Sequence, residues 1–300
     1  MDGSFFTSDG ASGDAERFAP TGHARGPWHA DHCHAGPPTG LLARAAERRV
    51  PDKRLTRLTV SLIRPIPHAG FRIESELVRA GRTVALVGAR IVGDDGRVAA
   101  TAEALLMARQ PVRGVPTHAD AIGVPEDAAP GGFPILETLH GLPAFNGAGV
   151  ETRYPVGQSR EPGPTAAWLR TVPLLPGEDA SPFQRICPLA DCGNAFGRNA
   201  GPAHTTFANA DLTIALHRDP VGEWLGTRAT GYWEPDGIGL ADAQLFDARG
   251  AVGRALQTLL LLPGPGGRER DDAAEGRQRA PASMPRKAST DSTRPQRNTP

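Results

Sequence analysis

One segment of this sequence occurs twice, and that repetition restricts the fold more than any other feature. Leu-Thr-Val-Ser-Leu-Ile-Arg-Pro at 58–65 returns as Leu-Thr-Ile-Ala-Leu-His-Arg-Asp at 212–219. The same offset, continued without a gap, sets Ala-Leu-Leu-Met at 104–107 against Thr-Leu-Leu-Leu at 258–261. Two copies of one supersecondary unit explain a register held over this length. Because the unit is long and present only twice, it predicts a pseudo-symmetric pair of domains rather than a solenoid.

Size and composition agree with two domains of ordinary size. The chain has 300 residues, and 39% of them are hydrophobic, which is enough to form buried cores. The formal net charge is zero, so composition gives no reason to expect nucleic acid or an anionic membrane as a partner. The amino terminus shows no secretory signal, and the apolar run 259–262 is too short to span a bilayer. We therefore expect a cytoplasmic protein without membrane insertion.

Cysteines and histidines give little support for a metal site. Three cysteines cannot all pair, and Cys187 and Cys192 do not have the spacing of a zinc knuckle or a redox pair, so reduced thiols are expected. His29, His32 and His34 resemble a metal cluster, but neighbouring residues of an extended segment point apart and no HExxH helix accompanies them. We predict no metal and no cofactor.

The first copy is predicted to be one helix followed by an antiparallel meander. Residues 41–49 are rich in helix formers with recurring apolar positions. The segments that follow alternate apolar and polar residues between glycine and proline breaks, as half-buried strands do. These predicted strands are 57–63, 71–79, 83–92 and 97–108.

The second copy follows the same plan with a more irregular helix. Ser181 precedes Pro182, with Gln184 at the third position, which is the pattern of a helix start. Pro188 should kink this helix or delay its regular part. The predicted strands are 150–154, 166–172, 210–217, 223–233, 240–247 and 252–262.

These elements divide the chain into four parts. We expect an N-terminal domain at 1–112 and a C-terminal domain at 142–263. The segment 113–141 between them is rich in proline, glycine and aspartate, as a connection is. Residues 264–300 are polar and rich in proline, which predicts a disordered tail.

A helix of about three turns and a four-stranded meander, present twice, predict an α+β double hot-dog: two curled antiparallel sheets, each wrapped around a central helix. One face of such a sheet is covered by the helix, so its strands should alternate in polarity. They do, since Leu58, Val60 and Leu62 alternate with two hydroxyl residues.

Six segments carry a family resemblance: 34–44, 58–65, 168–170, 173–174, 177–178 and 189–191. In these segments the chain resembles the double hot-dog acyl-CoA thioesterases of the bacterial thioesterase II type. The resemblance covers roughly residues 15–263 without the connection. It implies an acyl-CoA or acyl carrier protein thioester as substrate, with a homo-oligomer as the expected assembly.

The two copies differ in ionisable residues, and the difference indicates where chemistry could occur. The first helix has no carboxylate from Ala35 to Ala46, whereas the second carries Asp191. A charge inside a helix that a sheet covers is costly unless it is hydrogen-bonded or used, although an exposed or capping aspartate is the alternative. On the last strand, Gln257 stands against Glu103 by the gapless offset; its alternative is an outward-facing position.

The family's site is similar: an aspartate on the second helix, a hydroxyl residue two positions before the acid that opens the next strand, and a glutamine on the last strand. Carried over, these imply Asp191, Asn209 and Gln257 as catalytic residues, with His34 and Gly36 at the substrate. Asn209 stands where the family usually has threonine. It can hydrogen-bond a water or the carboxylate, but it cannot relay a proton.

The resemblance implies hydrolysis of an acyl thioester to free acid and thiol, with Asp191 as the base that activates water. Gln257 and Asn209 would hold the water in line, and backbone N–H groups or a side-chain amide would stabilise the oxyanion. The alternative is a non-catalytic acyl or acyl-CoA binding protein on the same fold. An enoyl-thioester hydratase is a third hypothesis, but it requires an Asp/His dyad, for which the sequence shows no suitably placed histidine.

Overall fold

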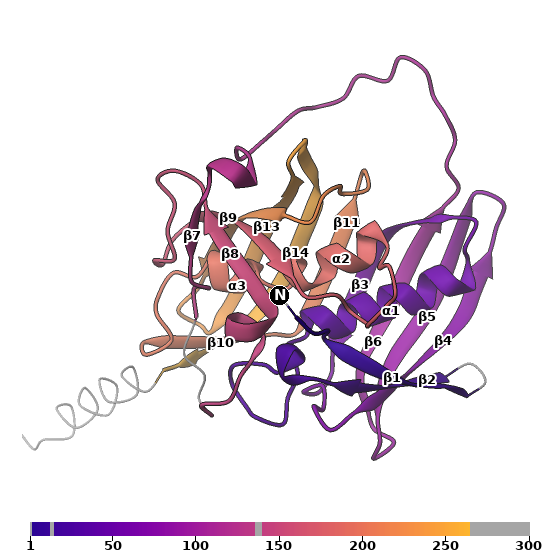
Figure 1. The fold of residues 1–300 in the computed structure, drawn as a ribbon, viewed down its shortest axis with the longest axis horizontal. Coiled ribbons are helices and arrows are strands. Elements are labelled where there is room, and N and C mark those ends of the chain that lie inside the picture. The colour runs from indigo at the N-terminus through magenta and orange to yellow at the C-terminus, as the bar shows by residue number, and fades with distance from the viewer. Residues whose placement is uncertain (1, 13–14, 136–139, 265–300) are drawn as a thin grey trace, which may run out of the picture.

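A computed structural model of the chain describes residues 2–12, 15–135 and 140–264. They form a large antiparallel sheet that curves around helices lying against one face (Figure 1). Most of the tail predicted at 264–300 lies outside the described residues. The strands are β1 (Phe6–Ser12), β2 (Ala15–Pro20), β3 (Arg54–Leu62), β4 (Phe71–Ala80), β5 (Val84–Gly93), β6 (Val98–Met107), β7 (Ala129–Gly131), β8 (Val150–Tyr154), β9 (Thr165–Thr171), β10 (Thr205–Asn209), β11 (Asp211–Leu216), β12 (Leu225–Trp233), β13 (Ile238–Asp247) and β14 (Gly250–Pro263). The helices are α1 (Gly36–Arg49), α2 (Pro182–Ala190) and α3 (Gly193–Phe196), with the short helical turns η1 (Gly22–Ala24), η2 (Pro125–Asp127) and η3 (Phe145–Gly149).

The two repeated segments meet in the middle of the sheet. The strand order is β1-β2-β4-β5-β6-β3-β11-β14-β13-β12-β9-β8-β7, with β10 paired to β14. In the β3–β11 pair, Thr59 lies opposite Thr213, its own counterpart in the repeat, and their hydroxyl oxygens are 3.3 Å apart. A residue that faces its own copy across an antiparallel pair marks a pseudo-two-fold axis. The sequence predicted two sheets; pairing β3 with β11 removes two open edges and joins the halves into one sheet.

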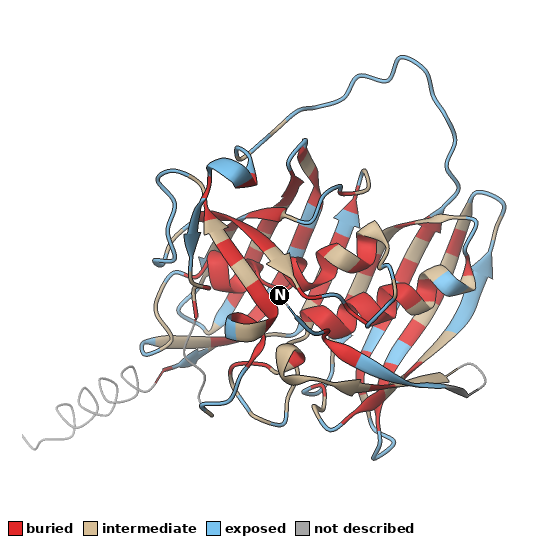
Figure 2. Ribbon diagram, in the orientation of Figure 1, coloured by how far each residue is buried: buried red, intermediate tan, exposed pale blue. Residues whose placement is uncertain are grey.

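Helix α1 packs on β3, β4, β5 and β6 of the first half. It begins at Gly36, five residues before the predicted start at Leu41, because Pro37 and Pro38 occupy the first turn, where proline costs no helical hydrogen bond. Four of its residues are fully buried, so this helix forms the core of its half: Leu41, Leu42, Ala43 and Ala46 (Figure 2).

In the second half the helix is divided in two. The Oγ of Ser181 accepts a hydrogen bond from the N–H of Gln184 at 3.2 Å, which confirms the predicted helix start. The helix continues past Pro188 and breaks at Asp191 and Cys192, where ψ rises to −3° at both residues. The predicted kink is therefore displaced three residues toward the carboxyl end. Its consequence is that Asp191 lies at the junction between α2 and α3.

Two glycines allow α1 and α2 to cross in close contact. A Cβ atom at Gly36 would lie 2.9 Å from the Cα of Pro188 and 3.0 Å from the Cβ of Asp191. One turn later, a Cβ at Gly40 would lie 3.1 Å from the carbonyl oxygen of Gln184. Only glycine permits this approach. The crossing brings the start of α1 directly against Asp191.

Polar side chains on α1 tie the helix to other elements. The guanidinium of Arg44 is 5% exposed and donates to both oxygens of Glu178 at 2.6 and 2.8 Å and to Glu16 on β2 at 2.7 Å. Arg48 lies next to the same two carboxylates but is 55% exposed. The carboxyl group of Glu47 accepts hydrogen bonds from the Ser181 hydroxyl and the Gln184 amide.

The gapless offset between the copies fails in the last strand. Glu103 on β6 pairs with Thr59, but the residue of β14 that pairs with the matching Thr213 is Leu256, not Gln257. The register has slipped by one residue. Since successive side chains of a strand face opposite sides, this slip turns Gln257 to the interior, where it is 1% exposed, while the Glu103 side chain is 57% exposed.

A shorter turn explains the slip. In the first half, the N–H of Gly93 donates to the carbonyl oxygen of Arg97 across the three residues 94–96, whereas in the second half its counterpart Asp247 pairs with Gly250 across the two residues 248–249. One residue is thereby moved from the turn into the strand. The length of a hairpin turn sets the register of the strand that follows.

Three parts of the fold are additions to the predicted elements. One is β10, which pairs with β14 and ends at Asn209, a residue that was predicted to precede a strand. Strands β1 and β2 form an N-terminal hairpin that joins the sheet through β4, and Phe5, Phe6 and Phe18 from this region are buried. The sequence analysis predicted no strand there. Within the predicted connection 113–141, β7 pairs with β8, so the end of this segment packs with the second half. None of the helices in the described part of the chain has the length and apolar character to cross a bilayer.

Candidate active site

Asp191 is buried at the junction of α2 and α3, where only 3% of its side chain is exposed. Its backbone N–H donates to the carbonyl oxygen of Cys187, which ends the regular part of α2. The break directs the carboxylate toward strands β10 and β14 and toward the start of α1. A buried carboxylate requires compensating donors.

Two amides bind one oxygen of this carboxylate. The Nδ2 of Asn209 donates to Asp191 Oδ1 at 2.8 Å, and the Nε2 of Gln257 donates to the same oxygen at 3.0 Å. The backbone N–H of Asn194 donates to Gln257 Oε1 at 3.0 Å, which leaves the amide nitrogen of Gln257 facing the aspartate. The three residues that the resemblance implied thus lie together, although their catalytic role stays a prediction.

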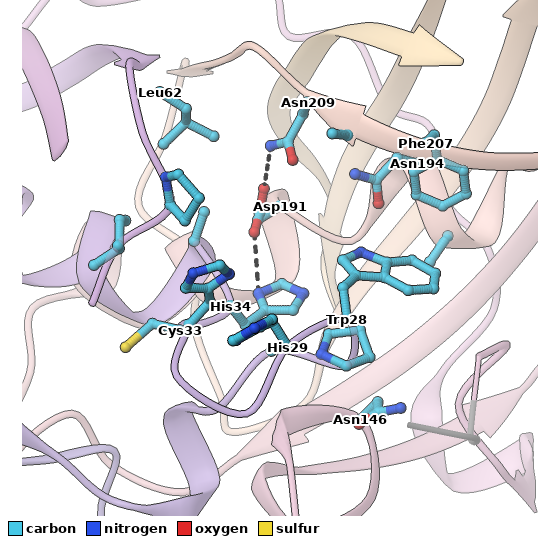
Figure 3. A pocket seen from close by; sticks show the side chains of 18 of the residues that line it. Trp28, His29, Cys33, His34, Leu62, Asn146, Asp191, Asn194, Phe207 and Asn209 are labelled. Atoms are coloured by element: carbon cyan, nitrogen blue, oxygen red, sulfur yellow. Dashed lines mark hydrogen bonds and ion pairs between the residues drawn. The ribbon is translucent and has the colours of Figure 1, made fainter. Parts of the chain in front are cut away.

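The second carboxylate oxygen is in contact with a histidine. His34 Nδ1 lies 3.0 Å from Asp191 Oδ2 (Figure 3). The sequence predicted no histidine for an Asp/His dyad, and that prediction was wrong. The two residues are far apart in sequence, and only the close crossing of α1 and α2 at Gly36 brings them together.

The site opens on a cavity of about 330 Å³ between the two halves. His34, Asp191 and Asn209 lie on its wall, whereas Gln257 lies behind Asp191 and Gly36 lies in the helix crossing, so neither lines the cavity. The polar wall faces a larger apolar one, which suits a ligand with an apolar chain and one reactive polar group. The apolar lining comprises Trp28, Leu62, Ile63, Ile66, Phe133, Ile135 and Phe207.

Sequence reasoning missed Asn194 as a candidate site residue. Its side chain lines the cavity, and its side-chain amide makes no hydrogen bond to any residue in the described part of the chain (Figure 3). Asn194 is 9% exposed and follows Asp191 by three positions, past the break between α2 and α3. Its closeness to Asp191 in the sequence was the available signal, because an amide buried among apolar residues is as informative as a buried carboxylate.

The cysteines near the site do not supply a nucleophile. Burial raises the pKa of the Cys187 and Cys192 thiols, and the nearby Asp191 carboxylate raises both further. Burial also raises the pKa of Cys33, which lines the cavity. A thiol must ionise to attack a carbonyl group. The three thiols are therefore poorly suited to attack a carbonyl group.

The predicted arrangement of the neighbouring histidines needs a correction. His29 and His32 do not point apart; their rings stack with centroids 4.3 Å apart. Both rings line the cavity. Among the described residues, no group of three or more His, Cys, Asp or Glu side chains is placed to hold a metal ion.

Comparison with known proteins gives a consistent result. The sequence profile of the acyl-CoA thioesterase N-terminal domain matches residues 24–107, and that of the acyl-CoA thioesterase C-terminal domain matches residues 118–261. No curated protein sequence gives a significant match.

Several solved structures share the fold. An acyl-CoA thioesterase II TesB2 from Mycobacterium marinum is 17% identical, with 86% of this chain and 97% of the other covered and a TM-score of 0.62. The tesB protein MAP1729c of Mycobacterium avium subs paratuberculosis is 15% identical, with coverages of 85% and 96% and a TM-score of 0.63. A conserved hot-dog protein from Alicyclobacillus acidocaldarius is 16% identical, with coverages of 84% and 95% and a TM-score of 0.64. At these identities the likeness shows a common fold.

Proposed function

The chain belongs to the acyl-CoA thioesterase family and is a thioester hydrolase, and from this premise we propose that it hydrolyses an acyl-CoA thioester with water activated by Asp191. The observation that carries the proposal is the environment of this carboxylate. It is 3% exposed, held by three side chains, and placed on the polar wall of a mostly apolar cavity. A positioned base of this kind contributes about 10² to 10⁴ in rate.

The chemistry of a thioester fits a site with one acid–base centre. The thiolate that leaves needs little help from an acid, so activation of water and stabilisation of the oxyanion are the two requirements. For the second, the side-chain amide of Asn194 is a suitable donor, because it lines the cavity near Asp191 and has no hydrogen-bond partner among the described residues. Loss of such a donor costs about 10² to 10³ in kcat.

Asn209 takes the position at which the family usually has a hydroxyl residue. In this chain its amide nitrogen donates to Asp191 Oδ1, so it holds the carboxylate in place. Holding the carboxylate requires a donor and not a proton relay. The substitution is therefore compatible with activity, and Asn209→Thr should retain it.

The finer architecture and the setting belong to the same proposal. The two helix-covered halves of the sheet fit a double hot-dog, in which α1 serves the first half and α2 with α3 the second. We place its units at 1–112 and 142–263. The substrate carrier is coenzyme A or acyl carrier protein, the location is the cytoplasm, and the assembly is a homo-oligomer.

The test is a chain-length series of acyl-CoA substrates with the release of thiol as the readout. Wild type is expected to release thiol, and Asp191→Asn, which keeps the size and the contacts of one oxygen, should lose at least about 10² in kcat. Saturable binding of acyl-CoA without thiol release would instead identify the non-catalytic binding protein and refute the proposal.

The contact between Asp191 and His34 also meets the requirement of the enoyl-thioester hydratase hypothesis. The two reactions are distinguished in one cuvette with a 2-enoyl-CoA. Hydration removes the absorbance of the conjugated double bond and leaves the thiol bound, whereas hydrolysis releases the thiol. Thiol release with little hydration is the expected result.

A further inference from the structure

We propose that His34 is a further catalytic residue, whose Nε2 atom accepts the proton of the attacking water while its Nδ1–H is held by Asp191. The inference rests on the proposed thioesterase function and specifies how Asp191 acts: through His34. Three features of the site support it, namely the occupancy of the carboxylate, the tautomer of the histidine and the direction of its free nitrogen.

The carboxylate of Asp191 is largely occupied by donors. A carboxylate has about four acceptor positions, two on each oxygen. Asn209 and Gln257 fill both positions of Oδ1, and His34 fills one of Oδ2. Three of the four positions are thus used to hold side chains. This is the pattern of a carboxylate that orients another group.

The hydrogen bond between the two residues fixes the tautomer of His34. Nδ1 lies 3.0 Å from Asp191 Oδ2 and 3.3 Å from the backbone nitrogen of Gly36. It cannot donate to the first and accept from the second. The bond to an ionised carboxylate is charge-assisted and shorter, so Nδ1 carries the proton. In this tautomer Nε2 has a free lone pair, as the base of a Ser-His-Asp triad does.

The ring of His34 is held firmly with its free edge at the cavity. Its backbone N–H donates to the carbonyl oxygen of Ala24 at 2.9 Å, and its ring stacks on Phe145 with centroids 4.1 Å apart. The side chain is 13% exposed and lines the cavity. Nε2 makes no hydrogen bond to any residue that the structure describes. A rigid, unpartnered basic atom therefore faces the space in which the substrate would bind.

The step balances without another reactant. The oxygen of water bonds to the thioester carbonyl carbon, while one of its protons passes to His34 Nε2 and the carbonyl electrons move to oxygen. Collapse of this intermediate breaks the carbon–sulfur bond, and sulfur leaves with the bonding pair. The proton on Nε2 passes to sulfur, which gives the thiol and the free acid. The imidazolium formed in between is stabilised by Asp191.

The test separates the two nitrogens of His34. In His34→Asn, the amide nitrogen takes the place of Nδ1 and still donates to Asp191, but no atom replaces Nε2. This variant should lose about 10² or more in kcat, although it should melt near wild type. In His34→Ala, added imidazole should restore part of the activity, an effect that a purely structural role would not produce. Both variants are assayed on the acyl-CoA that wild type cleaves best.

The outcomes are distinct. If wild type releases no thiol, the proposed function fails and this inference fails with it. If wild type is active and Asp191→Asn is not, but His34→Asn keeps the wild-type kcat, then the thioesterase proposal survives and the role of Nε2 is refuted. If His34→Asn does not fold, the imidazole experiment on His34→Ala decides, and a lack of rescue refutes the role.

Discussion

A single methyl group at Gly36 should damage the site more than the fold. Its Cβ would lie 2.9 Å from the Cα and carbonyl oxygen of Pro188 and 3.0 Å from the Cβ of Asp191. Ordinary contacts begin at 3.4 Å, so α1 and α2 would have to separate by about 0.5 Å. Backbone atoms cannot rotate out of the way, which makes this shift unavoidable in Gly36→Ala.

Gly36→Ala should affect stability and activity to different extents. Overpacking costs typically about 1–3 kcal/mol of stability, and the better helix propensity of alanine returns up to about 1 kcal/mol. The net loss should therefore stay within about 3 kcal/mol. The effect on activity is larger, because catalytic groups must be held within about 0.5 Å of their working positions and a displacement of 1 Å costs about 10² in rate.

The assay is kcat for thiol release from the best acyl-CoA, measured together with the melting temperature. Gly40→Ala is the matched control, since its methyl group enters the same helix crossing one turn further along α1, against Leu174 and the carbonyl oxygen of Gln184 and not against Asp191. Gly201→Ala, with no atom within 4 Å of the new methyl group, controls for the substitution itself. The reasoning fails if Gly36→Ala keeps the wild-type kcat, or if Gly40→Ala loses as much activity at the same stability.

Three further predictions concern groups whose partners are described above. Arg44→Ala should lower the free energy of unfolding by about 3 kcal/mol, because it removes a buried cation from two carboxylates. Arg48→Ala should lower it by at most about 1 kcal/mol, because Arg48 is exposed. Equal losses of the two variants in denaturant titrations would contradict this prediction. Burial raises the pKa of Glu47 above its ordinary value of 4.5, so the folded chain binds that proton more tightly than the unfolded chain. The stability that this provides is present below pH 4.5 and is lost as pH rises through the folded pKa of Glu47. Glu47→Gln should therefore flatten the curve of melting temperature against pH over this range. An unchanged slope would refute the argument. Because burial raises the pKa of the Cys187 and Cys192 thiols, iodoacetamide at pH 8 should label them only after denaturation, as read by peptide mass spectrometry, and labelling of the folded protein at the rate of free thiols would show that the site is open.

Local patterns in the sequence were enough to locate most of the secondary structure. The strands of both copies fall within a few residues of their predicted ranges, because alternation of polarity and glycine or proline breaks are local signals. The start of α1 was predicted five residues late, because its first turn consists mostly of glycine and proline, which are poor helix formers. The N-terminal hairpin was not predicted at all, because its strand β1 is short of apolar residues and gains its stability from pairing in the sheet.

The site residues also differ in how far the sequence could identify them. Asp191 could be selected from the sequence, because a carboxylate on a helix that a sheet must cover is a conflict visible without coordinates. Gln257 was selected through the resemblance and a gapless offset that the strand itself does not follow. Whether its amide faces inward depends on the length of the turn at residues 248–249.

The sequence by itself determined that a helix and a meander occur twice, and that the second helical segment carries Asp191 where the first has no acid from Ala35 to Ala46. Both facts follow from residue composition and from the spacing at which apolar residues recur, which are properties of neighbouring residues. The tertiary structure alone decided that Gln257 turns inward and that His34 meets Asp191. The orientation of Gln257 depends on strand register, and the contact of His34 depends on how closely two helices cross at Gly36. Both are relations between segments that are distant in sequence and meet only when the chain folds.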